Sequence, residues 1–304
     1  MKTISVVCPV YNEEQVIKLF HAELIRILDG LAGRYRSEVL YVVDRSTDRT
    51  LGILKELAVD PRIRILALSA RFGHQMSLLA GIDHSSGDAV VMLDSDLQHP
   101  PALIPRLIEE FEKGFDVVYT VRNDSPLSSR LFYRLLNRIS DVPIDTNAPD
   151  FRLISRRVAD VFRYQIRERN QFIRGLVGWV GFRRSAVEFN VAERAAGTSK
   201  YALGRLLRLA AEGIVSFSKR PLQAAIVTGL VFAALSLLLV VATLIQYFAY
   251  RSLPSGWTTL VIIISAFNGV QLIFLGVLGE YIGAIFDEVK GRPHYIIEEK
   301  IGLD

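Results

Sequence analysis

The chain has 304 residues, with a formal net charge of +4 and a hydrophobic share of 50%. This length allows one large domain and an additional segment, and the mild positive charge gives no indication of nucleic-acid binding. The mean hydropathy of +0.28 is high for a purely soluble protein. The single cysteine, Cys8, excludes an internal disulfide and is most simply a buried strand residue.

The N-terminal part of the chain alternates between two hydrophobic periods. Short, nearly continuous apolar runs are typical of strands that are covered on both faces. Such runs occupy residues 4–10, 39–43, 63–68, 89–93 and 117–121. Helical patterns fill the gaps, at residues 16–31, 51–57, 75–82 and 103–111. This alternation predicts an α/β fold with a Rossmann-like, mainly parallel sheet.

Polar motifs follow four of the predicted strands at the point where each strand ends. They are PVYNEE, DRSTD, ARFGHQ and DSD, in chain order. Ligands of parallel α/β sheets bind beyond the carboxyl ends of the strands, so these motifs are expected to form one site. In the first motif, Asn12 and Gln15 have the spacing of a helix capping box. No G-x-G-x-x-G follows the first strand, so a dinucleotide site of the usual kind is unsupported.

Asp94 and Asp96 directly follow the fourth apolar run. Side chains alternate along a strand, so two carboxylates one residue apart point to the same side if the strand geometry continues. Their repulsion requires a nearby positive charge, and Mg²⁺ or Mn²⁺ is a hard cation that bridges carboxylates to phosphate oxygens. The alternative is that one of them only caps a helix that begins near Pro101. A phosphatase with a strand-end Asp-x-Asp-x-Thr is disfavoured, because Leu-Gln follows Asp96.

Two long apolar segments lie near the C-terminus, at residues 221–250 and 258–283. No charged residue lies between Arg220 and Arg251, or between Arg251 and Glu280. About 20 apolar residues are enough to cross a bilayer, so we predict two antiparallel transmembrane helices joined by a short link. A buried helical hairpin in a soluble core is the alternative.

Basic residues around these segments predict their orientation. Lys219 and Arg220 precede the first segment and Lys290 and Arg292 follow the second, whereas the link carries only Arg251. The positive-inside rule then places the large N-terminal part and both termini in the cytoplasm, on a multi-pass protein of the inner (plasma) membrane.

The segment before the first span has apolar residues on one helical face, and we predict an amphipathic helix at 200–220 in the membrane interface. Packing of this helix against the preceding domain is the alternative. The remaining parts are a cytoplasmic domain at 1–199 and a cytoplasmic tail at 284–304. Gly279 and Gly283 have the spacing that lets helices approach closely, either within the hairpin or between copies in a homo-oligomer.

With these motifs in view, the chain resembles the family-two glycosyltransferases that load a sugar onto a membrane polyprenyl phosphate. The matching pieces span nearly the whole chain and are VVCPVYNEE, VDRSTDRT, FGHQMSLLAGIDHSSGDAVVMLDSDLQHPP, DFRLISR, GTSKY, FSKRPL and KGRPHYII. The two spans and the last motif look most like bactoprenol (undecaprenyl-phosphate) glucosyltransferases, to which dolichol-phosphate mannose synthases are related. The resemblance implies a GT-A nucleotide-sugar domain. It also implies inverting transfer of a hexose, with glucose favoured, from a UDP-sugar to polyprenyl phosphate, releasing UDP.

The resemblance also implies roles for individual residues. Asp96 is the expected principal metal ligand, with Asp94 beside it near the ribose and diphosphate. Gln98 is expected to contact donor or acceptor, and Asp150 is expected at the reaction centre. The residues expected to line the nucleotide pocket are Pro9, Tyr11, Glu13 and Asp44, the last accepting from the uracil edge. The residues expected to hold the lipid phosphate are Arg122, Arg130, Arg134 and Lys200, and a membrane-facing charge without a specific ligand is the alternative for them.

Two features depart from the family pattern. Arg45 stands where the family usually has a glycine, which would permit a positive φ or close ligand approach, although its side chain could instead reach a phosphate. The stretch at 122–130 is several residues shorter than usual, which affects the expected acceptor site.

The chemistry of the acceptor bears on the role of Asp150. A phosphate monoester has a second pKa of about 6, so its oxygen arrives ionised and no base has to remove a proton. We therefore predict that Asp150 orients an arginine or the metal shell. The alternatives are transfer of mannose or a modified pentose, and a non-catalytic nucleotide-sugar-binding or flippase-like partner. The presence of Asp96 and the small number of spans disfavour the non-catalytic alternative.

Overall fold

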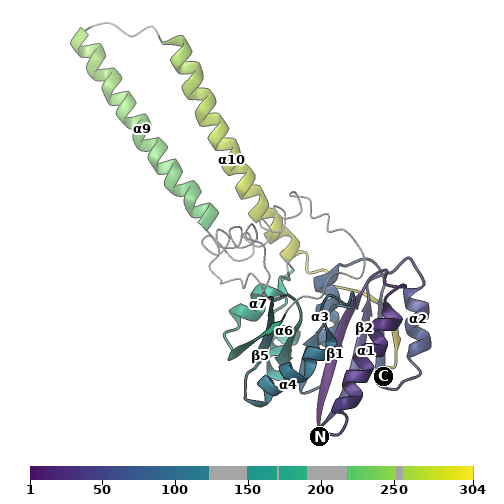
Figure 1. The fold of residues 1–304 in the computed structure, drawn as a ribbon. Helices are drawn as coiled ribbons and strands as arrows, with labels where there is room; N and C mark the ends of the chain where they lie inside the picture. Colours follow the sequence, from purple (N-terminus) through teal and green to yellow (C-terminus); the bar gives the residue numbers. More distant parts are fainter. Residues whose placement is uncertain (123–148, 170, 190–217, 219, 251–255, 304) are drawn as a thin grey trace. The chain divides into compact units, whose positions relative to one another are not determined.

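The computed structural model describes residues 1–122, 149–169, 171–189, 218, 220–250 and 256–303 (Figure 1). The chain forms two compact units, and the described residues of the second are 218, 220–250 and 256–291. The first unit contains the N-terminal part together with Arg292–Asp304. The residues predicted as a tail at 284–304 thus include the end of the last long helix and a segment that belongs to the first unit.

One eight-stranded sheet organises the described part of the first unit. Its order is β7-β5-β6-β4-β1-β2-β3-β8, and only β6 and β8 run against the direction of the others. The strands are β1 (Lys2–Val10), β2 (Tyr35–Val43), β3 (Ile63–Leu68), β4 (Ala89–Met92), β5 (Val117–Arg122), β6 (Arg152–Ser155), β7 (Arg184–Phe189) and β8 (Ile297–Ile301). The predicted α/β fold with a mainly parallel sheet is confirmed.

Helices cover both faces of this sheet. They are α1 (Ile17–Leu31), α2 (Thr50–Leu57), α3 (His74–His84), the 3₁₀ turn η1 (Pro101–Leu103), α4 (Ile104–Glu112), α6 (Arg156–Tyr164) and α7 (Ile173–Trp179). The side chains of α1, α2 and α4 share one apolar cluster with the strands, whereas Ala80 of α3 packs in a cluster on the other face. The loops that lead from β1 into α1, from β2 into α2 and from β3 into α3 therefore all lie at the carboxyl edge of the sheet.

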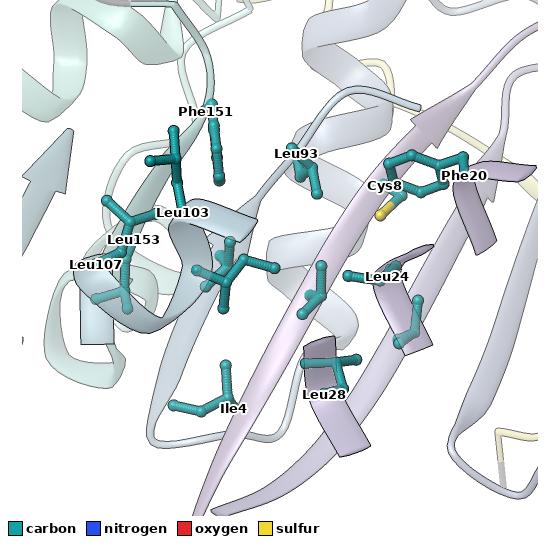
Figure 2. Close-up of a cluster of buried hydrophobic side chains, with 14 of the residues drawn as sticks. Ile4, Cys8, Phe20, Leu24, Leu28, Leu93, Leu103, Leu107, Phe151 and Leu153 are labelled. Carbon is teal, nitrogen blue, oxygen red and sulfur yellow. The ribbon is translucent and has the colours of Figure 1, made fainter. Parts of the chain in front are cut away.

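The core follows from side-chain alternation along the strands. Cys8 and its alternate neighbours on β1 point toward α1, where Phe20, Leu24 and Leu28 are buried beside them (Figure 2). Val42 on β2 points to the opposite face and joins the cluster that contains Ala80. Burial of each large apolar side chain stabilises the fold by roughly 1.5–3 kcal/mol. Cys8 is fully buried, as predicted.

Gly81 determines how closely α3 approaches the sheet. A Cβ atom at this position would lie 2.1 Å from Cγ1 of Val7 on β1. Since real side chains do not tolerate such a contact, only a glycine lets α3 lie at this height above β1. The position of α3 matters because its first residue, His74, faces the polar end of the sheet.

The predicted capping box at Asn12 and Gln15 is wrong. Helix α1 begins after Val16, which makes no side-chain cap. Asn12 instead has a positive φ of 54° and its side chain accepts a hydrogen bond from the amide of Thr47, 2.8 Å away. The side chain that would cap the helix is therefore used to join two loops.

The second unit contains two long apolar helices, α9 (Arg220–Tyr250) and α10 (Trp257–Val289). By length and composition, Arg220–Ile245 and Ile262–Val289 are candidate membrane spans, and their apolar side chains are not buried within the chain. The rings of Phe232 and Phe267 meet edge to face, with centroids 4.9 Å apart. The interfacial helix predicted at 200–220 lies outside the described residues, apart from Ser218 and Arg220.

Candidate active site

The loops after β1 and β2 are joined by hydrogen bonds between side chains and backbone. The amide of Asn12 donates to Oγ of Ser46 at 3.0 Å, and the amide of Thr47 donates back to the Asn12 side chain. The amide of Glu14 donates to Asp48 at 3.1 Å. The NEE and RSTD motifs therefore form one continuous polar wall at the carboxyl edge of the sheet.

Asp44 joins the end of β2 to the beginning of α3. Its two carboxylate oxygens accept hydrogen bonds from the amides of Phe72 at 2.7 Å and Gly73 at 2.9 Å. Gly73 precedes α3 with a φ of 92°, a conformation that favours glycine. Asp44 thus fixes Gly73, the residue directly before α3. A carboxylate has about four lone-pair positions, so Asp44 retains capacity to accept from a ligand.

Two arginines lie in the loops after β2 and β3. Arg45 has a positive φ of 31°, a backbone conformation that favours glycine. Its guanidinium donates a hydrogen bond to the carbonyl of Ser69. The guanidinium of Arg71 stacks over the ring of Tyr11, 4.2 Å from the ring centroid. Pro9 lies near the end of β1, two residues before Tyr11. Its carbonyl accepts a hydrogen bond from the hydroxyl of buried Ser95 at 3.1 Å.

Asp94 lies between two imidazoles. Its Oδ1 is 2.7 Å from Nε2 of His74, and its Oδ2 is 3.5 Å from Nδ1 of His99. His99 is buried against the rings of Phe151 and Phe189, with centroids about 6 Å away. Burial alone would lower the pKa of His74, but Asp94, with which it is hydrogen-bonded, raises it above the ordinary value.

Asp96 forms a tight local turn. Its Oδ1 accepts from the amide of Gln98 at 3.0 Å, its Oδ2 accepts from the Gln98 side chain at 2.6 Å, and Leu97 between them has a φ of 60°. The alternative in which Asp94 or Asp96 caps the next helix is wrong, because η1 begins after Pro100 with no side-chain cap.

Asp150 is a buried carboxylate held by cations. Its Oδ2 lies 3.0 Å from Nη2 of Arg174, and its Oδ1 lies 3.6 Å from Nη2 of Arg152. Nδ1 of His74 lies 3.9 Å from the same carboxylate. Burial alone would raise the pKa of Asp150, but Arg174, Arg152 and His74 together hold it well below the ordinary value. Asp150 is therefore ionised throughout the neutral range.

Four carboxylates lie close together in the loops after β1, β2 and β4. The pKa of Glu13 is raised to about 7 by burial and by the charges of Asp96, Asp48 and Asp94. Among the described residues, no three Asp, Glu, His or Cys side chains form a group that holds a metal by itself. Mg²⁺ is commonly held by one or two carboxylates and completed by substrate phosphates and water. Asp96, supported by Asp94, fits that kind of partial site.

Comparison with known proteins decides the family. Residues 5–186 match the family described as Glycosyl transferase family 2. The chain belongs to this family. It is 42% identical to the SfII prophage-derived bactoprenol glucosyl transferase of Shigella flexneri over 97% of each chain. It is 41% identical to the uncharacterized glycosyltransferase YkcC of Bacillus subtilis (strain 168), over 99% of this chain and 94% of that one.

A solved structure supports the fold of this glycosyltransferase. Mannosyl-3-phosphoglycerate synthase from Rubrobacter xylanophilus superposes with a TM-score of 0.50 at 16% identity, covering 69% of this chain and 71% of that chain. The fold is therefore GT-A-like, as the sequence resemblance implies.

The structure of the glycosyltransferase brings some predicted site residues together and leaves others outside the described residues. The charges of Asp94 and Asp96 contribute to the raised pKa of Glu13, and His74 lies between Asp94 and Asp150. The backbone of Arg122 ends β5, but its side chain lies outside the described residues. The other predicted phosphate-binding residues, which also lie outside them, are Arg130, Arg134 and Lys200.

Several residues of the site were not predicted individually, among them Arg71, which stacks over Tyr11. His74 lies in the FGHQ motif and His99 in the motif that contains Asp94, so the sequence contained a signal for both. Arg174 lies in none of the polar motifs and comes from α7, which was not predicted. Only the fold shows that Arg174, among the cations that the structure describes, lies 3.0 Å from Asp150.

Proposed function

We propose that this glycosyltransferase transfers glucose from UDP-glucose to a polyprenyl phosphate, with inversion at the sugar carbon. The acceptor rests on one observation: similarity to a bactoprenol glucosyl transferase covers 97% of both chains, including the region of α9 and α10. The two candidate spans are consistent with a lipid substrate. The catalytic unit and both termini lie on the cytoplasmic side in this proposal.

The donor would bind at the carboxyl ends of β1 to β4. Tyr11, stacked under Arg71, offers an aromatic face for the uracil ring, and Asp44 accepts from the uracil edge. Pro9 and Glu13 complete this pocket. The diphosphate then lies toward Asp94 and Asp96, beyond β4.

Charge neutralisation activates the leaving group. Mg²⁺ or Mn²⁺ at Asp96 and Asp94 would neutralise the diphosphate and cancel the negative charge that raises the pKa of Glu13. Gln98 fixes the Asp96 carboxylate by donating to it from both its amide and its side chain. His74 and His99 hold Asp94.

The acceptor needs positioning rather than deprotonation. Its phosphate is largely ionised at neutral pH, and Asp150 is too acidic to serve as an efficient base there. Asp150 instead orients Arg174 and Arg152 beside the reaction centre. Arg122, Arg130, Arg134 and Lys200 are the residues proposed to hold the lipid phosphate. A single displacement from an α-linked donor then gives a β-linked product.

An in vitro transfer assay tests the proposal. The full chain in detergent is incubated with undecaprenyl phosphate and either UDP-glucose, GDP-mannose or a nucleotide-linked pentose, and lipid-linked sugar is measured. We expect product with UDP-glucose and equimolar UDP. Product only with another donor would overturn the choice of glucose, and no product with any donor, from protein that is folded, would overturn the enzymatic function. The Asp96→Ala variant gives the background.

A further inference from the structure

The chain returns to the catalytic unit soon after α10 ends at Val289. Strand β8 pairs antiparallel with β3, and the amide of Ser69, just beyond β3, donates to the carbonyl of Ile296 at 2.9 Å. The carbonyl of Ser69 also accepts from the guanidinium of Arg45. The residues before β8 are therefore bonded to the loop that carries Arg71 and Gly73 on the donor side.

The same segment is bonded to the connection between α6 and α7. Nη1 of Arg169 donates to the carbonyls of Arg292 at 3.1 Å and Pro293 at 2.8 Å. Nε2 of His294 lies 3.2 Å from the carbonyl of Arg167. We call Arg292–Ile296 the strap, because it contacts both the loop after β3 and the connection that precedes α7.

Asp83 joins the strap to α3. Its carboxylate accepts from the hydroxyl of Tyr295 at 2.7 Å and from Nη1 of Arg167 at 2.9 and 3.0 Å. Asp83 is buried in the last turn of α3. The ring of Tyr295 packs on the apolar cluster that contains Val42 and Leu66. The Tyr295 side chain thus makes two kinds of contact: its ring packs on the apolar cluster, and its hydroxyl donates to Asp83.

The opposite end of α3 belongs to the active site. Oε1 of Gln75 accepts from the amide of Ile173, the first residue of α7, at 3.1 Å. The next residue, Arg174, holds Asp150 at 3.0 Å. Helix α3 is therefore bonded at its start to α7 and at its end to the connection that leads into α7.

We propose that Tyr295, Asp83 and Arg167 are positioning residues for glycosyl transfer: together they fix the strap and the connection to α7, so that Arg174 stays on Asp150. None of the three touches the reacting atoms. Their effect reaches the site through α7. The amide of Ile173, the first residue of α7, is bonded to Gln75, and the connection before α7 is bonded to Asp83 through Arg167 and to the strap through Arg169. The catalytic part of this inference rests on the proposed function.

The competing explanation is that the strap only stabilises the fold. Strand β8 covers the β3 edge of the sheet, and covering an edge is useful in itself. A purely structural role would make the contacts of Tyr295 equivalent to those that β8 itself makes. The chain offers such a contact, because Nζ of Lys55 on α2 pairs with Glu299 of β8 at 2.7 Å, away from the strap.

The experiment compares Tyr295→Phe with Lys55→Ala in the full chain. Tyr295→Phe keeps the packed ring and removes one hydrogen bond to a charged group. We measure hydrogen exchange at the Ile173 amide and, separately, kcat and KM for nucleotide sugar and lipid phosphate. In Tyr295→Phe we expect exchange at Ile173 to accelerate roughly tenfold and KM for lipid phosphate to rise roughly threefold to tenfold, with kcat and donor KM changed by less than about twofold. In Lys55→Ala none of these quantities should change.

A second variant extends the test. Asp83→Asn weakens both the Tyr295 and the Arg167 contacts, so it should accelerate exchange at Ile173 more than Tyr295→Phe does. Exchange at Ile173 that stays at the wild-type rate in a folded Tyr295→Phe variant would overturn the proposal. Faster exchange with an unchanged KM for lipid phosphate would overturn the catalytic part and leave a structural strap. Because exchange is measured without substrate, loss of the proposed function by itself would leave the exchange result intact.

Discussion

Nε2 of His74 lies 2.7 Å from Oδ1 of Asp94. Nδ1 of the same ring lies 3.9 Å from Oδ2 of Asp150. One imidazole thus stands between the carboxylate that follows β4 and the buried carboxylate that precedes β6. This placement makes His74 a link between the donor and acceptor sides of the proposed reaction.

Replacement of His74 by Gln should reduce transfer while the fold persists. Glutamine keeps a hydrogen-bonding group but cannot reach both carboxylates with a rigid ring. Residues that support ligands of a metal typically contribute about 10- to 100-fold to activity, and we expect a loss of kcat/KM in that range. His21→Gln, which removes the contact between the His21 ring and the hydroxyl of Tyr41, is the control and should stay near wild type. Equal losses in both variants would contradict a specific role for His74.

Removal of Asp96 should abolish transfer. The Asp96→Ala variant loses the expected principal metal ligand and the acceptor of two Gln98 hydrogen bonds. Activity should fall to background while the melting temperature changes little, and EDTA should have the same effect on wild type, reversed by Mg²⁺ or Mn²⁺. Full activity of wild type in EDTA would disprove the metal site.

Replacement of Asp150 by Asn distinguishes orientation from base catalysis. Because the acceptor phosphate arrives ionised and the pKa of Asp150 is low, the variant should keep measurable turnover that a higher pH does not improve. The main defect should be a raised KM for lipid phosphate, since Arg174 loses its charged partner. A kcat that falls by about 10²–10⁴-fold with unchanged lipid KM is the result expected of a base, and it would refute the orienting role.

Glu13 should make the metal-free protein less stable as the pH rises. Its pKa is raised from 4.5 to about 7 in the folded protein, so the folded state binds more protons than the unfolded state between these values. Stability from this group is present below pH 4.5 and is lost as the pH rises toward about 7. In EDTA, Glu13→Gln should show a smaller decrease in melting temperature than wild type between about pH 5 and about pH 7.5. The same decrease in both proteins would show that Glu13 does not titrate in this range.

Gly81→Ala should destabilise the protein because the new Cβ would overlap Val7. Overpacking of a core typically costs about 1–3 kcal/mol in the free energy of unfolding. Gly52→Ala on α2 is the matched control, since a Cβ there meets nothing within 4 Å and the helix should gain up to about 1 kcal/mol. Adding Val7→Ala should recover part of the loss at Gly81, and strictly additive effects would argue against the clash.

Local sequence patterns predicted most of the scaffold. The run at 63–68 became β3, and the patterns at 16–31 and 51–57 became α1 and α2 within one residue at each end. Such predictions succeed because a strand covered on both faces and an amphipathic helix each impose a period on nearby residues. The positions of Asp44, Asp94 and Glu13 at strand ends follow from the same patterns.

Non-local contacts were decided only by the tertiary structure. Strand β8 pairs with β3 across more than two hundred residues, and no turn signal links them. Arg174 approaches Asp150 because the Gln75 side chain and the connection after α6 place α7, not because of any spacing along the chain. Likewise, the Asn12 side chain bonds to Thr47 rather than capping α1, because the two loops meet in space. The sequence by itself determined the first five strands, the four helices that alternate with them, the two long apolar helices and the polar strand ends, because each depends on residues close together in the chain. Which of those polar groups touch, and which cation holds Asp150, depended on how distant elements pack.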